Sequence, residues 1–381
     1  MQRVMIVSGE ASGDLHGAHL VAALKDLVPG LSVCGMGGPE LRRQGVEILY
    51  DAAKMAVVGL VEVFAHLADI RAARTILEDE LRRRPPDLLI LIDYPDFNLL
   101  LAATAKKLGI PVFYYISPQV WAWRSGRVKK IGRLVDRMAV ILPFEQEFYR
   151  ERGVAVDYVG HPLLDSVRTT MDRAAFCRLY RIDPDHLLIG LLPGSRKKEI
   201  RTMLPLFLSV LAELRARHER LTVLLPLAPT LDRQDLYGAG LVPDCPWVRV
   251  VDDNRYDLMA SCDVALATSG TVTLELAILD VPTVVAYKVN PLTWWLGRML
   301  VDVPFASLVN LVAGREVIPE LLQGQASVIA LRAALEEIRP GGPQYAQVRR
   351  DLAEVRKKLG GEGASRRAAE VAIAASHRVT V

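Results

Sequence analysis

Cysteine is scarce in this sequence, and its scarcity argues against two classes of protein. Only four cysteines occur among 381 residues, and no pair has the C-x-x-C spacing. A secreted disulfide scaffold or a cysteine zinc site needs closer and more regular spacing. We therefore expect ordinary thiols in a reducing compartment at Cys34, Cys177, Cys245 and Cys262.

Long apolar runs and a surplus of charge of one sign are also missing. No stretch approaches the roughly 18 uncharged apolar residues that a membrane-spanning helix needs, and the apolar run at the N-terminus is too short for a signal peptide. The formal net charge is only +3, which argues against bulk nucleic-acid binding. These absences predict a cytoplasmic protein without nucleic acid as a partner, whose contact with a membrane is peripheral.

The sequence does contain short apolar runs that alternate with longer amphipathic stretches, a pattern typical of a parallel α/β sheet. Two series of strands are expected. The first comprises Val4–Ser8, Leu31–Cys34, Leu88–Asp93, Val112–Ile116, Arg137–Leu142 and Asp157–Val159. The second comprises Leu187–Pro193, Leu221–Pro226, Val248–Val251, Val264–Thr268 and Thr283–Tyr287. Helices are expected at Leu15–Leu27, Asp69–Arg84 and Leu99–Leu108.

Two doubly wound parallel-sheet units in tandem are the simplest explanation of this pattern. The chain is long enough for two hydrophobic cores, and the turn-forming Gly160-His161-Pro162 marks the boundary. We expect domains at residues 1–165 and 166–344, and a helical tail at 345–381 that packs back on the first domain or on a partner subunit. Because ligands of parallel sheets bind beyond the carboxyl ends of the strands, the cleft between two such facing sheets is the expected active site.

The loop Ser8–Asp14 follows the first strand and precedes a helix. Its glycines permit a tight turn, Ser12 can cap the helix, and the amides around Gly13 can bind an anion. The acidic Glu10 argues against a dinucleotide, and its place at a strand end favours a functional carboxylate over a merely solvated one. The glycines of Gly35-x-Gly37-Gly38 predict only a tight turn after the second strand.

The loop Asp93–Asn98 follows the most apolar strand and contains two carboxylates and an amide. This composition suits a general base that deprotonates a hydroxyl group. The alternative is that Asp93 and Asn98 only cap a turn and the next helix. We favour Asp96 over Asp93 as the catalytic candidate.

Aromatic side chains gather in residues 114–124, which contain two tyrosines and two tryptophans. Flat aromatic faces pack on sugar rings or acyl chains. The basic residues that follow suit phosphate or anionic lipid headgroups. A packed aromatic corner followed by a solvated helix face explains the same residues equally well.

The turn Gly194-Ser195-Arg196 opens the second series and suits a phosphate. Gly194 permits close backbone approach, Ser195 can donate a hydrogen bond, and Arg196 can hold a diphosphate bidentately. The G-K-[ST] of a P-loop is missing, so triphosphate hydrolysis is not indicated.

A second anion-binding turn, Ser269-Gly270-Thr271, precedes another helix. Its amides can bind phosphate oxygens, and Glu275, one turn later, can accept hydrogen bonds from ribose hydroxyls or only cap the helix. Two such turns in one sheet predict a nucleotide-diphosphate site.

Histidines contribute little to the predicted site. His16 lies beside the first loop and is a weak candidate for substrate binding, whereas His161 is expected to be structural. No His, Asp and Glu cluster has metal-ligand spacing, so neither a metal nor another cofactor is expected.

Two apolar segments, Met55–Phe64 and Pro291–Leu300, are candidates for a membrane-facing surface. The second combines paired tryptophans with an arginine, as interfacial helices do. Core packing remains the alternative for each segment taken alone.

Taken in order, the motifs resemble one family, the lipid-A-disaccharide synthases. The resemblance rests on Ser8–Asp14, Pro95–Asn98, Val120–Arg124, Leu142–Glu145, Val159–Pro162, Leu192–Arg196, Ser269–Thr271, Asn310 and Glu320–Gln323. It covers about residues 4 to 324. Tyr94, where alanine is commoner, and Gln119, where a small residue is expected, depart from the family pattern and put acyl-chain preference in doubt.

This resemblance implies a GT-B fold and transfer of 2,3-diacylglucosamine from UDP to the 6-hydroxyl of 2,3-diacylglucosamine 1-phosphate (lipid X). An inverting reaction of this kind forms a β-1,6 disaccharide 1-phosphate and UDP in lipid A biosynthesis. Asp96 or Glu10 would be the general base, Arg196 would neutralise the leaving diphosphate, and Asn310 would line the donor side. The inner membrane and a second copy of the chain are the other expected partners.

Two rival functions remain. A soluble UDP-sugar enzyme, such as an N-acetylglucosaminyltransferase or a 2-epimerase, would not need the apolar segments. A nucleotide-sugar binding protein without catalysis would gain nothing from the carboxylates of Glu10 and Asp96.

Overall fold

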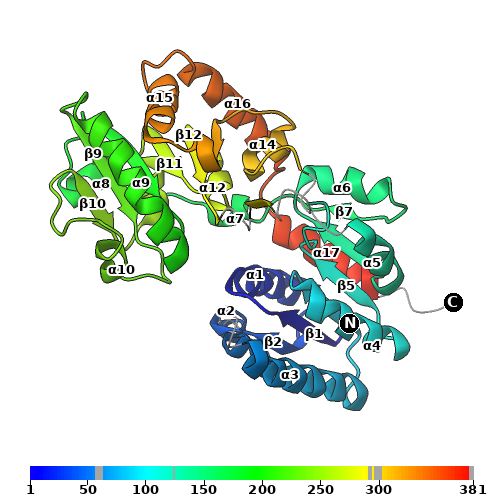
Figure 1. Ribbon diagram of the computed structural model, residues 1–381. Coiled ribbons are helices and arrows are strands. Elements are labelled where there is room, and N and C mark those ends of the chain that lie inside the picture. The colour runs from blue at the N-terminus through cyan, green and yellow to red at the C-terminus, as the bar shows by residue number, and fades with distance from the viewer. Residues whose placement is uncertain (56–62, 123–124, 291–293, 296–302, 377–381) are drawn as a thin grey trace. The chain divides into compact units, whose positions relative to one another are not determined.

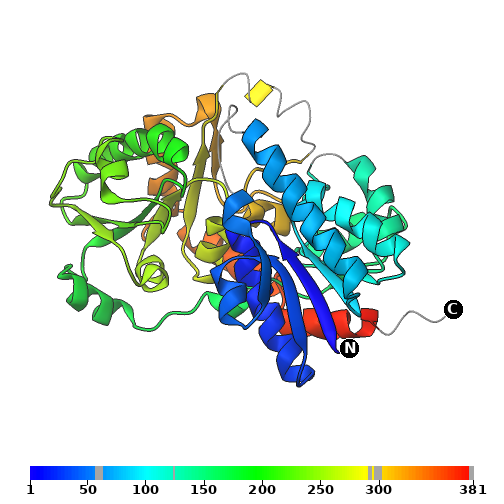
Figure 2. The same cartoon turned by 90° about the horizontal axis from the view of Figure 1, so that it is seen from below.

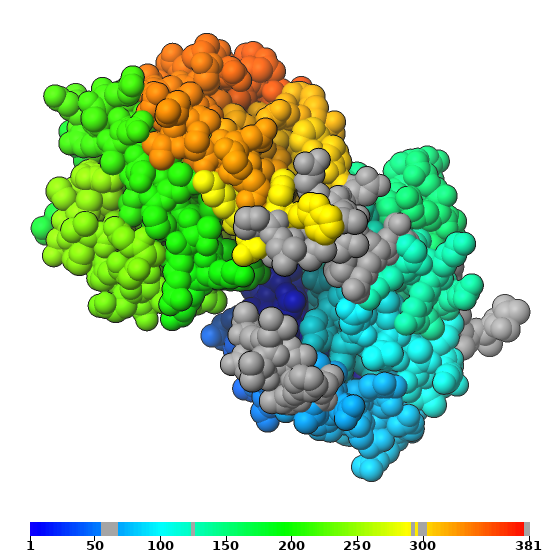
Figure 3. Space-filling view, in the orientation of Figure 1, coloured from blue at the N-terminus to red at the C-terminus, as the bar shows by residue number. Residues whose placement is uncertain are grey.

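The computed structural model describes residues 1–55, 63–122, 125–290, 294–295 and 303–376, the coloured parts of Figures 1 and 3. The chain divides into two compact units. Unit 1 comprises Met1–Pro162 and Gly360–Val381, and unit 2 comprises Leu163–Leu359. Each unit is built on one parallel sheet covered by helices, which confirms the predicted α/β class with two doubly wound sheets.

The sheet of unit 1 has seven strands in the order β3-β2-β1-β4-β5-β6-β7. The order reverses between β1 and β4, which pair in parallel from Val4 with Leu88 to Ser8 with Ile92. The strands are β1 (Arg3–Ser8), β2 (Ser32–Gly37), β3 (Glu47–Asp51), β4 (Leu88–Ile92), β5 (Val112–Tyr115), β6 (Arg137–Val140) and β7 (Asp157–Tyr158). The predicted strands are therefore present, and β3 is an additional one. It escaped prediction because it is an edge strand whose residues are only partly buried.

Helices cover both faces of this sheet. The α-helices are α1 (Ala11–Leu27), α2 (Pro39–Arg43), α3 (Val63–Arg83), α4 (Pro95–Lys107), α5 (Val128–Leu134), α6 (Pro143–Arg150) and α17 (Ala364–Ser376), with short 3-10 turns at η1 (Ala52–Met55) and η2 (Ser125–Arg127). One core lies between the sheet and helices α3, α4 and α5. On the sheet's other face α17 packs beside α1, as Figures 1 and 2 both show.

The glycines at residues 35–38 lie differently from the prediction. Gly35 and Gly37 belong to β2 itself, and the pairing of β2 with β3 shifts register at Gly35. Gly35 has a φ of +151°, and a Cβ there would lie 1.8 Å from the carbonyl oxygen of Ile6. Gly35 therefore marks an irregularity in the β2–β3 pairing and lets β2 approach β1 closely, while only Gly38 lies in a turn, between β2 and α2.

Gly35→Ala is expected to lower the free energy of unfolding by about 3 kcal/mol or more, because the added methyl collides with the β1 backbone, which has no room to move. Gly109→Ala is the matched control, since Gly109 has a φ of +72° but nothing within 4 Å of its Cβ position. That control should cost only about 1 kcal/mol of backbone strain. Urea unfolding of both variants measures the difference, and equal losses would refute the assigned collision.

The sheet of unit 2 has six strands in the order β10-β9-β8-β11-β12-β13. The order reverses between β8 and β11, where Leu192 lies opposite Ala267. The strands are β8 (Leu187–Leu192), β9 (Leu221–Pro226), β10 (Val248–Val251), β11 (Val264–Ala267), β12 (Thr283–Tyr287) and β13 (Glu320–Leu322). All five predicted strands are present. The edge strand β13 was missed because it has only three residues, all of them half-buried.

Helices cover both faces of this second sheet as well. They are α7 (Leu163–Ser166), α8 (Arg173–Tyr180), α9 (Lys197–Arg215), α10 (Arg233–Tyr237), α11 (Arg255–Ala260), α12 (Val272–Ile278), α14 (Leu308–Ala313), α15 (Val328–Ile338) and α16 (Tyr345–Lys358), with a 3-10 turn at η3 (Gln323–Gln325). One core lies between the sheet and helices α8, α11 and α12.

The segment 345–381 is divided between the two units. Helix α16 packs against α12 and α14 of unit 2, and α17 packs against α1 and against strands β4, β5 and β6 of unit 1. The helical conformation is interrupted between α16 and α17, where Gly360 and Gly363 have φ angles of +91° and +90°. Because these angles favour glycine, the Gly-Gly-Glu-Gly stretch ends one helix and redirects the chain into the next.

Candidate active site

The carboxyl ends of β1 and β4 form the first part of the candidate site. Glu10 follows β1, and Asp93 follows β4. These strands are neighbours at the point where the strand order of the sheet reverses. Such a switch point is where open parallel sheets bind ligands. The topology therefore places the two acidic loops predicted from sequence next to each other.

Glu10 stands at the N-cap of α1 with an extended backbone and an exposed side chain. The predicted capping by Ser12 is wrong, because the helix already begins at Ala11 and Ser12 lies exposed in its first turn. Within the described residues, no side chain caps the start of α1. Gly13 is buried, and a Cβ there would lie 2.6 Å from Ser8 Oγ, so the loop packs tightly under a helix start whose amides can receive an anion.

Asp93 and Tyr94 form a strained turn directly after β4. Their φ angles are +42° and +44°, in the left-handed region that costs a residue other than glycine about 1–3 kcal/mol. Two bonds hold the turn: the carbonyl oxygen of Asp93 accepts from Asn98 Nδ2 at 2.7 Å and from the hydroxyl of Tyr114. The ring of Tyr94 also lies over Gly9, where a Cβ would come within 2.6 Å of it. Strain held by this many contacts is common at functional sites.

Asp93 and Asp96 have different environments. Burial, and then the negative charge of Glu10, raise the pKa of Asp93 to about 6. Asp96 lies in the first turn of α4 with its side chain 76% exposed, and it forms an ion pair with Arg127. A half-buried carboxylate with a pKa near neutrality is better suited to proton transfer than an exposed, paired one. Asp93, which we ranked second from the sequence, therefore joins Asp96 and Glu10 as a candidate base.

Three histidines lie close to this site. Burial lowers the pKa of His16 to about 4 and that of His161 to about 3; His19 adds to the shift of His16, and His16 to that of His161. His16 and His161 are therefore neutral near pH 7. His16, the weak binding candidate, lies on α1, and its Nδ1 has no hydrogen-bond partner among the described residues.

The low pKa of His161 predicts a pH-dependent stability. A histidine whose pKa falls from 6.5 to about 3 on folding stabilises the fold above pH 6.5, and that stability is lost as the pH falls toward 3. Relative to a His161→Gln variant, the wild-type free energy of unfolding should fall by about 1.4 kcal/mol per pH unit in this window. Urea unfolding of both proteins at pH 7.5, 6 and 5 measures the difference in their free energies of unfolding. A difference that stays constant with pH would contradict this assignment.

The second part of the candidate site lies at the carboxyl ends of β8 and β11, the switch point of the unit 2 sheet. Thr268 N donates to Leu192 O at 2.9 Å, so the turns that follow these two strands start side by side. The two anion-binding turns predicted from sequence, Gly194–Arg196 and Ser269–Thr271, are therefore neighbours. This is the arrangement expected of a nucleotide site in an open parallel sheet.

Glu199 occupies the anion-binding groups of the first turn. It lies in the first turn of α9, and its carboxylate accepts from Arg196 Nη1 at 2.7 Å and from Ser195 N at 3.2 Å. Gly194 has a φ of +111°, and a Cβ there would come within 2.5 Å of Glu199. A carboxylate held by a backbone amide and a guanidinium indicates that these groups are oriented to bind an anion.

The second turn is held to a neighbouring loop by the side chain of Ser269. Ser269 Oγ donates to Ala306 O at 2.7 Å, while Gly270 and Thr271 are exposed. Glu275 is only 6% exposed and forms an ion pair with Arg255. Its pKa is raised, because burial outweighs the opposing positive charge of Arg255. The predicted ribose-binding carboxylate thus lies beside an arginine that we did not predict.

Asn310 is fully buried, and its amide is used within unit 2. Its Oδ1 accepts from the amides of Val317 and Ile318 at 2.8 and 3.1 Å, and its Nδ2 donates to Glu320 Oε1 at 2.7 Å. Glu320 also accepts from the amide of Ala306 at 2.8 Å, and the carbonyl of Ala306 holds Ser269. A series of hydrogen bonds therefore connects Asn310 with the Ser269 turn through Glu320 and Ala306.

Sequence reasoning assigned no role to Glu199, Arg255 or Glu320. Glu199 had a signal, because it stands three residues after the N-cap residue of α9, where a capping side chain is expected. Arg255 had none, since it is 20 residues from its partner Glu275. Glu320 stood in the family motif Glu320–Gln323, but nothing local indicated its bond to Asn310, 10 residues away. Only folding brings them to the site.

The predicted apolar segments and part of the aromatic stretch lie mostly outside the described residues. Met55–Phe64 and Pro291–Leu300 lie largely outside the described residues, and so do Trp123 and Arg124 of the aromatic stretch. Among the described helices, none has the length and hydropathy needed to span a bilayer. No group of three or more His, Cys, Asp or Glu residues in the described part of the chain is arranged to hold a metal ion.

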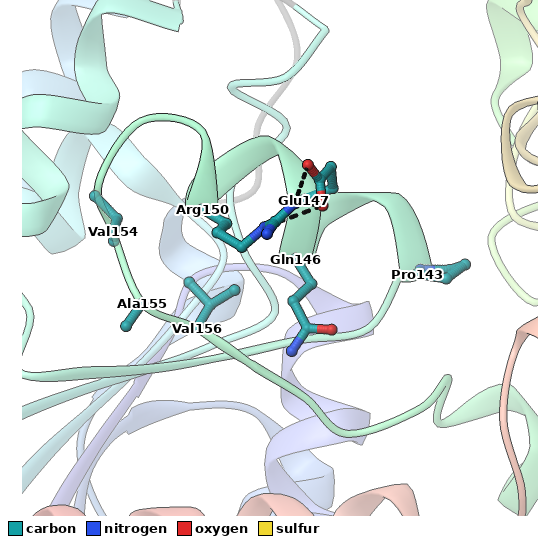
Figure 4. Close-up of a pocket in the computed structure, with 7 residues that line it drawn as sticks. All are labelled: Pro143, Gln146, Glu147, Arg150, Val154, Ala155 and Val156. Carbon is teal, nitrogen blue, oxygen red and sulfur yellow. Dashed lines mark hydrogen bonds and ion pairs between the residues drawn. The ribbon is translucent and has the colours of Figure 1, made fainter.

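A pocket of about 360 Å³ opens elsewhere on unit 1, over α6 and the loop that follows it (Figure 4). Arg150 reaches back to Glu147 in an ion pair along its rim, and Val154 and Val156 line the apolar side. None of its lining residues belongs to the predicted site. We assign no ligand to it.

Solved structures with a similar fold include a UDP-GlcNAc 2-epimerase from Neisseria meningitidis bound to UDP-GlcNAc and a calicheamicin glycosyltransferase. The first has a TM-score of 0.66 and 14% identity and covers 98% of this chain and 99% of its own. The second has a TM-score of 0.65 and 16% identity, with 100% of both chains covered. These similarities define the class of fold: two parallel-sheet units of the GT-B type.

The particular family follows from sequence comparison. The model of the lipid-A-disaccharide synthetase family matches residues 4–375. Lipid-A-disaccharide synthases from Geobacter sulfurreducens and Myxococcus xanthus are 49% and 44% identical, each covering 97% of this chain and 96% of the relative. The chain belongs to the lipid-A-disaccharide synthase family, and it is a glycosyltransferase.

Proposed function

We propose that this chain transfers 2,3-diacylglucosamine from UDP to the 6-hydroxyl of lipid X. The products would be a β-1,6-linked disaccharide 1-phosphate and UDP. Family membership supports the reaction type. The observation on this chain that carries the proposal is the pair of carboxylates, Glu10 and Asp93, at the switch point of the unit 1 sheet, where the pKa of Asp93 is raised to about 6.

The donor would bind to unit 2. The amides of Gly194-Ser195 and of Ser269–Thr271 would receive the two phosphates, and Arg196 would exchange its bond to Glu199 for one to the diphosphate. Glu275, oriented by Arg255, would accept hydrogen bonds from the ribose hydroxyls. As the sugar leaves the diphosphate, negative charge grows on the UDP oxygens, and Arg196 lowers the energy of that state.

The acceptor would bind to unit 1, with its 6-hydroxyl at Asp93. An inverting transfer in one step needs one general base, and a carboxylate with a pKa of about 6 is largely ionised at pH 7 yet basic enough to accept the proton. Glu10 supports this assignment by raising the pKa of Asp93. Asp96 and Glu10 remain the alternative bases that the sequence predicts, and the corresponding amide variants separate the three.

Peripheral association with the inner membrane is part of the proposal, because both substrates carry acyl chains. The apolar segments Met55–Phe64 and Pro291–Leu300 are the proposed contacts. Trp295, in the second segment, is 59% exposed, which supports this assignment. A homodimer is a further proposed state, which light scattering in detergent would test.

The test is product formation from UDP-2,3-diacylglucosamine and lipid X in detergent with EDTA present. A disaccharide 1-phosphate with stoichiometric UDP supports the reaction, the acceptor and independence from metal together. Tight UDP binding without disaccharide would instead favour the rival of a nucleotide-sugar binding protein. Epimerised UDP-sugar as the only product would favour the epimerase rival.

A further inference from the structure

Glu145 is a fully buried carboxylate that the reaction proposed above does not use. It lies in the first turn of α6 and is 2% exposed. One carboxylate oxygen accepts from the amides of Ile141 and Leu142 at 3.2 and 2.9 Å. The other accepts from Trp121 Nε1 at 3.1 Å. One side chain thus ties the loop after β5 to the loop after β6.

The same loop is held to α6 at other points. Ser117 Oγ hydrogen-bonds the hydroxyl of the buried Tyr149 at 2.7 Å. The indole of Trp121 packs edge-on against Phe144, with ring centroids 4.9 Å apart and an interplanar angle of 83°. Ser117 and Trp121, at the two ends of this segment, therefore both contact α6.

The loop begins with a strained residue. Ile116 has a φ of +62°, which is a rare conformation for a β-branched side chain. Strand β5 pairs with β4, and Tyr114 of β5 donates to the carbonyl oxygen of Asp93. The strained start of the aromatic loop and the strained Asp93-Tyr94 turn therefore follow adjacent strands at the same edge of the sheet.

We propose that Glu145 is a positioning residue for the acceptor: it holds the half-buried indole of Trp121 so that the loop after β5 presents a fixed aromatic surface to the acceptor sugar beside Asp93. Sugar rings pack their C–H faces on aromatic side chains, and a fixed ring loses less entropy when a ligand binds. The inference rests on the proposed function, because it assigns the acceptor to unit 1.

A role in folding alone does not explain this carboxylate. Capping α6 occupies only one of its two oxygens, and the second is used on the indole. Burial raises the pKa of Glu145 from 4.5 to about 7, so an ionisable group here lowers stability progressively above pH 4.5, and the full loss is reached above pH 7. A neutral glutamine could still accept from the amides of Ile141 and Leu142 without that cost, but its Nε2 could not accept from the indole. The arrangement fits a residue kept for the orientation of its partner.

Trp121→Phe is the decisive variant, because it keeps an aromatic ring and removes the N–H donor to Glu145. We expect the KM for lipid X to rise about tenfold, while kcat and the KM for the UDP donor change less than twofold. Glu145→Gln should also raise the KM for lipid X. The double variant should be no worse than the more affected single variant, because both changes remove one interaction.

Glu147→Gln is the matched control, since Glu147 lies on the same helix, is exposed, and pairs only with Arg150 among the described residues. It should change neither KM. An unaltered KM for lipid X in Trp121→Phe, or equal changes in both KM values, would overturn the proposal even where Glu145→Gln does not fold.

Failure of the proposed function would give a different result from failure of the positioning proposal: the wild-type chain would form no disaccharide. Calorimetric affinity for lipid X, measured on the same variants, tests the positioning of Trp121 in that event. A tenfold weaker affinity in Trp121→Phe supports it, and an equal affinity refutes it.

Discussion

Replacing Asp93 by asparagine should reduce kcat by about 10²–10⁴-fold while leaving the affinity for UDP unchanged. The magnitude is that of a lost general base. Asparagine has nearly the shape of aspartate and tolerates the left-handed conformation that residue 93 adopts, with its φ of +42°. The turn held by Asn98 and Tyr114 should therefore persist. Steady-state kinetics and calorimetric titration with UDP make the two measurements.

The pH dependence provides a second test of the same assignment. Because the base must be ionised, wild-type kcat/KM should rise as the pH increases through about 6, the pKa of Asp93. Glu10→Gln removes a negative charge that raises this pKa, so the acidic limb should move to lower pH.

Asp96→Asn is the control, since Asp96 is exposed and paired with Arg127. A large loss of kcat in Asp96→Asn together with an active Asp93→Asn would transfer the assignment to Asp96, the residue preferred from sequence. A similar pattern with Glu10→Gln would transfer it to Glu10.

Arg196→Gln should lower kcat/KM for the UDP donor by about 10²–10³-fold, the effect of removing one group that stabilises developing charge. The guanidinium already holds the carboxylate of Glu199, so it is oriented toward an anion before any donor binds. Arg196→Lys should recover only part of the loss, because an ammonium group does not form two parallel bonds to a diphosphate.

Arg220→Gln is the matched control for this experiment. Arg220 is also an exposed arginine of unit 2 that pairs with carboxylates, those of Asp183 and Asp185. It precedes β9, so it lies at the amino end of the strands, away from the candidate site. An Arg220→Gln variant as impaired as Arg196→Gln would mean that the loss comes from overall charge and not from the diphosphate contact.

Much of this protein followed from local sequence. Periodic apolar runs identified the central strands of both sheets, because a strand buried on both faces must be almost wholly apolar. Polar loops directly after those strands made Glu10, Arg196 and the Ser269–Thr271 turn candidate site residues. The motif order indicated the family that the comparisons then established. Edge strands β3 and β13 were missed because partly exposed, short segments carry no such pattern.

The choice between Asp93 and Asp96 depended on the tertiary structure. Both carboxylates stand in the same loop, and nothing in the sequence distinguishes a half-buried one from an exposed one. The left-handed turn after β4 buries Asp93 beside Glu10, whereas α4 directs Asp96 to Arg127. A pKa depends on burial and on charges brought near by folding, and neither is a local property of the chain.

The sequence by itself determined the fold class and the reaction family and indicated the loops in which we propose that the chemistry lies, since these depend on residue type and spacing along one chain. The tertiary structure alone decided which side chains act together: Glu145 with Trp121, Glu199 with Arg196, and Glu320 with Asn310. Hydrogen bonds and ion pairs require distances near 3 Å, and in Glu145 and Trp121 the partners are 24 residues apart in the chain. Only the packing of strands and helices brings such residues within reach.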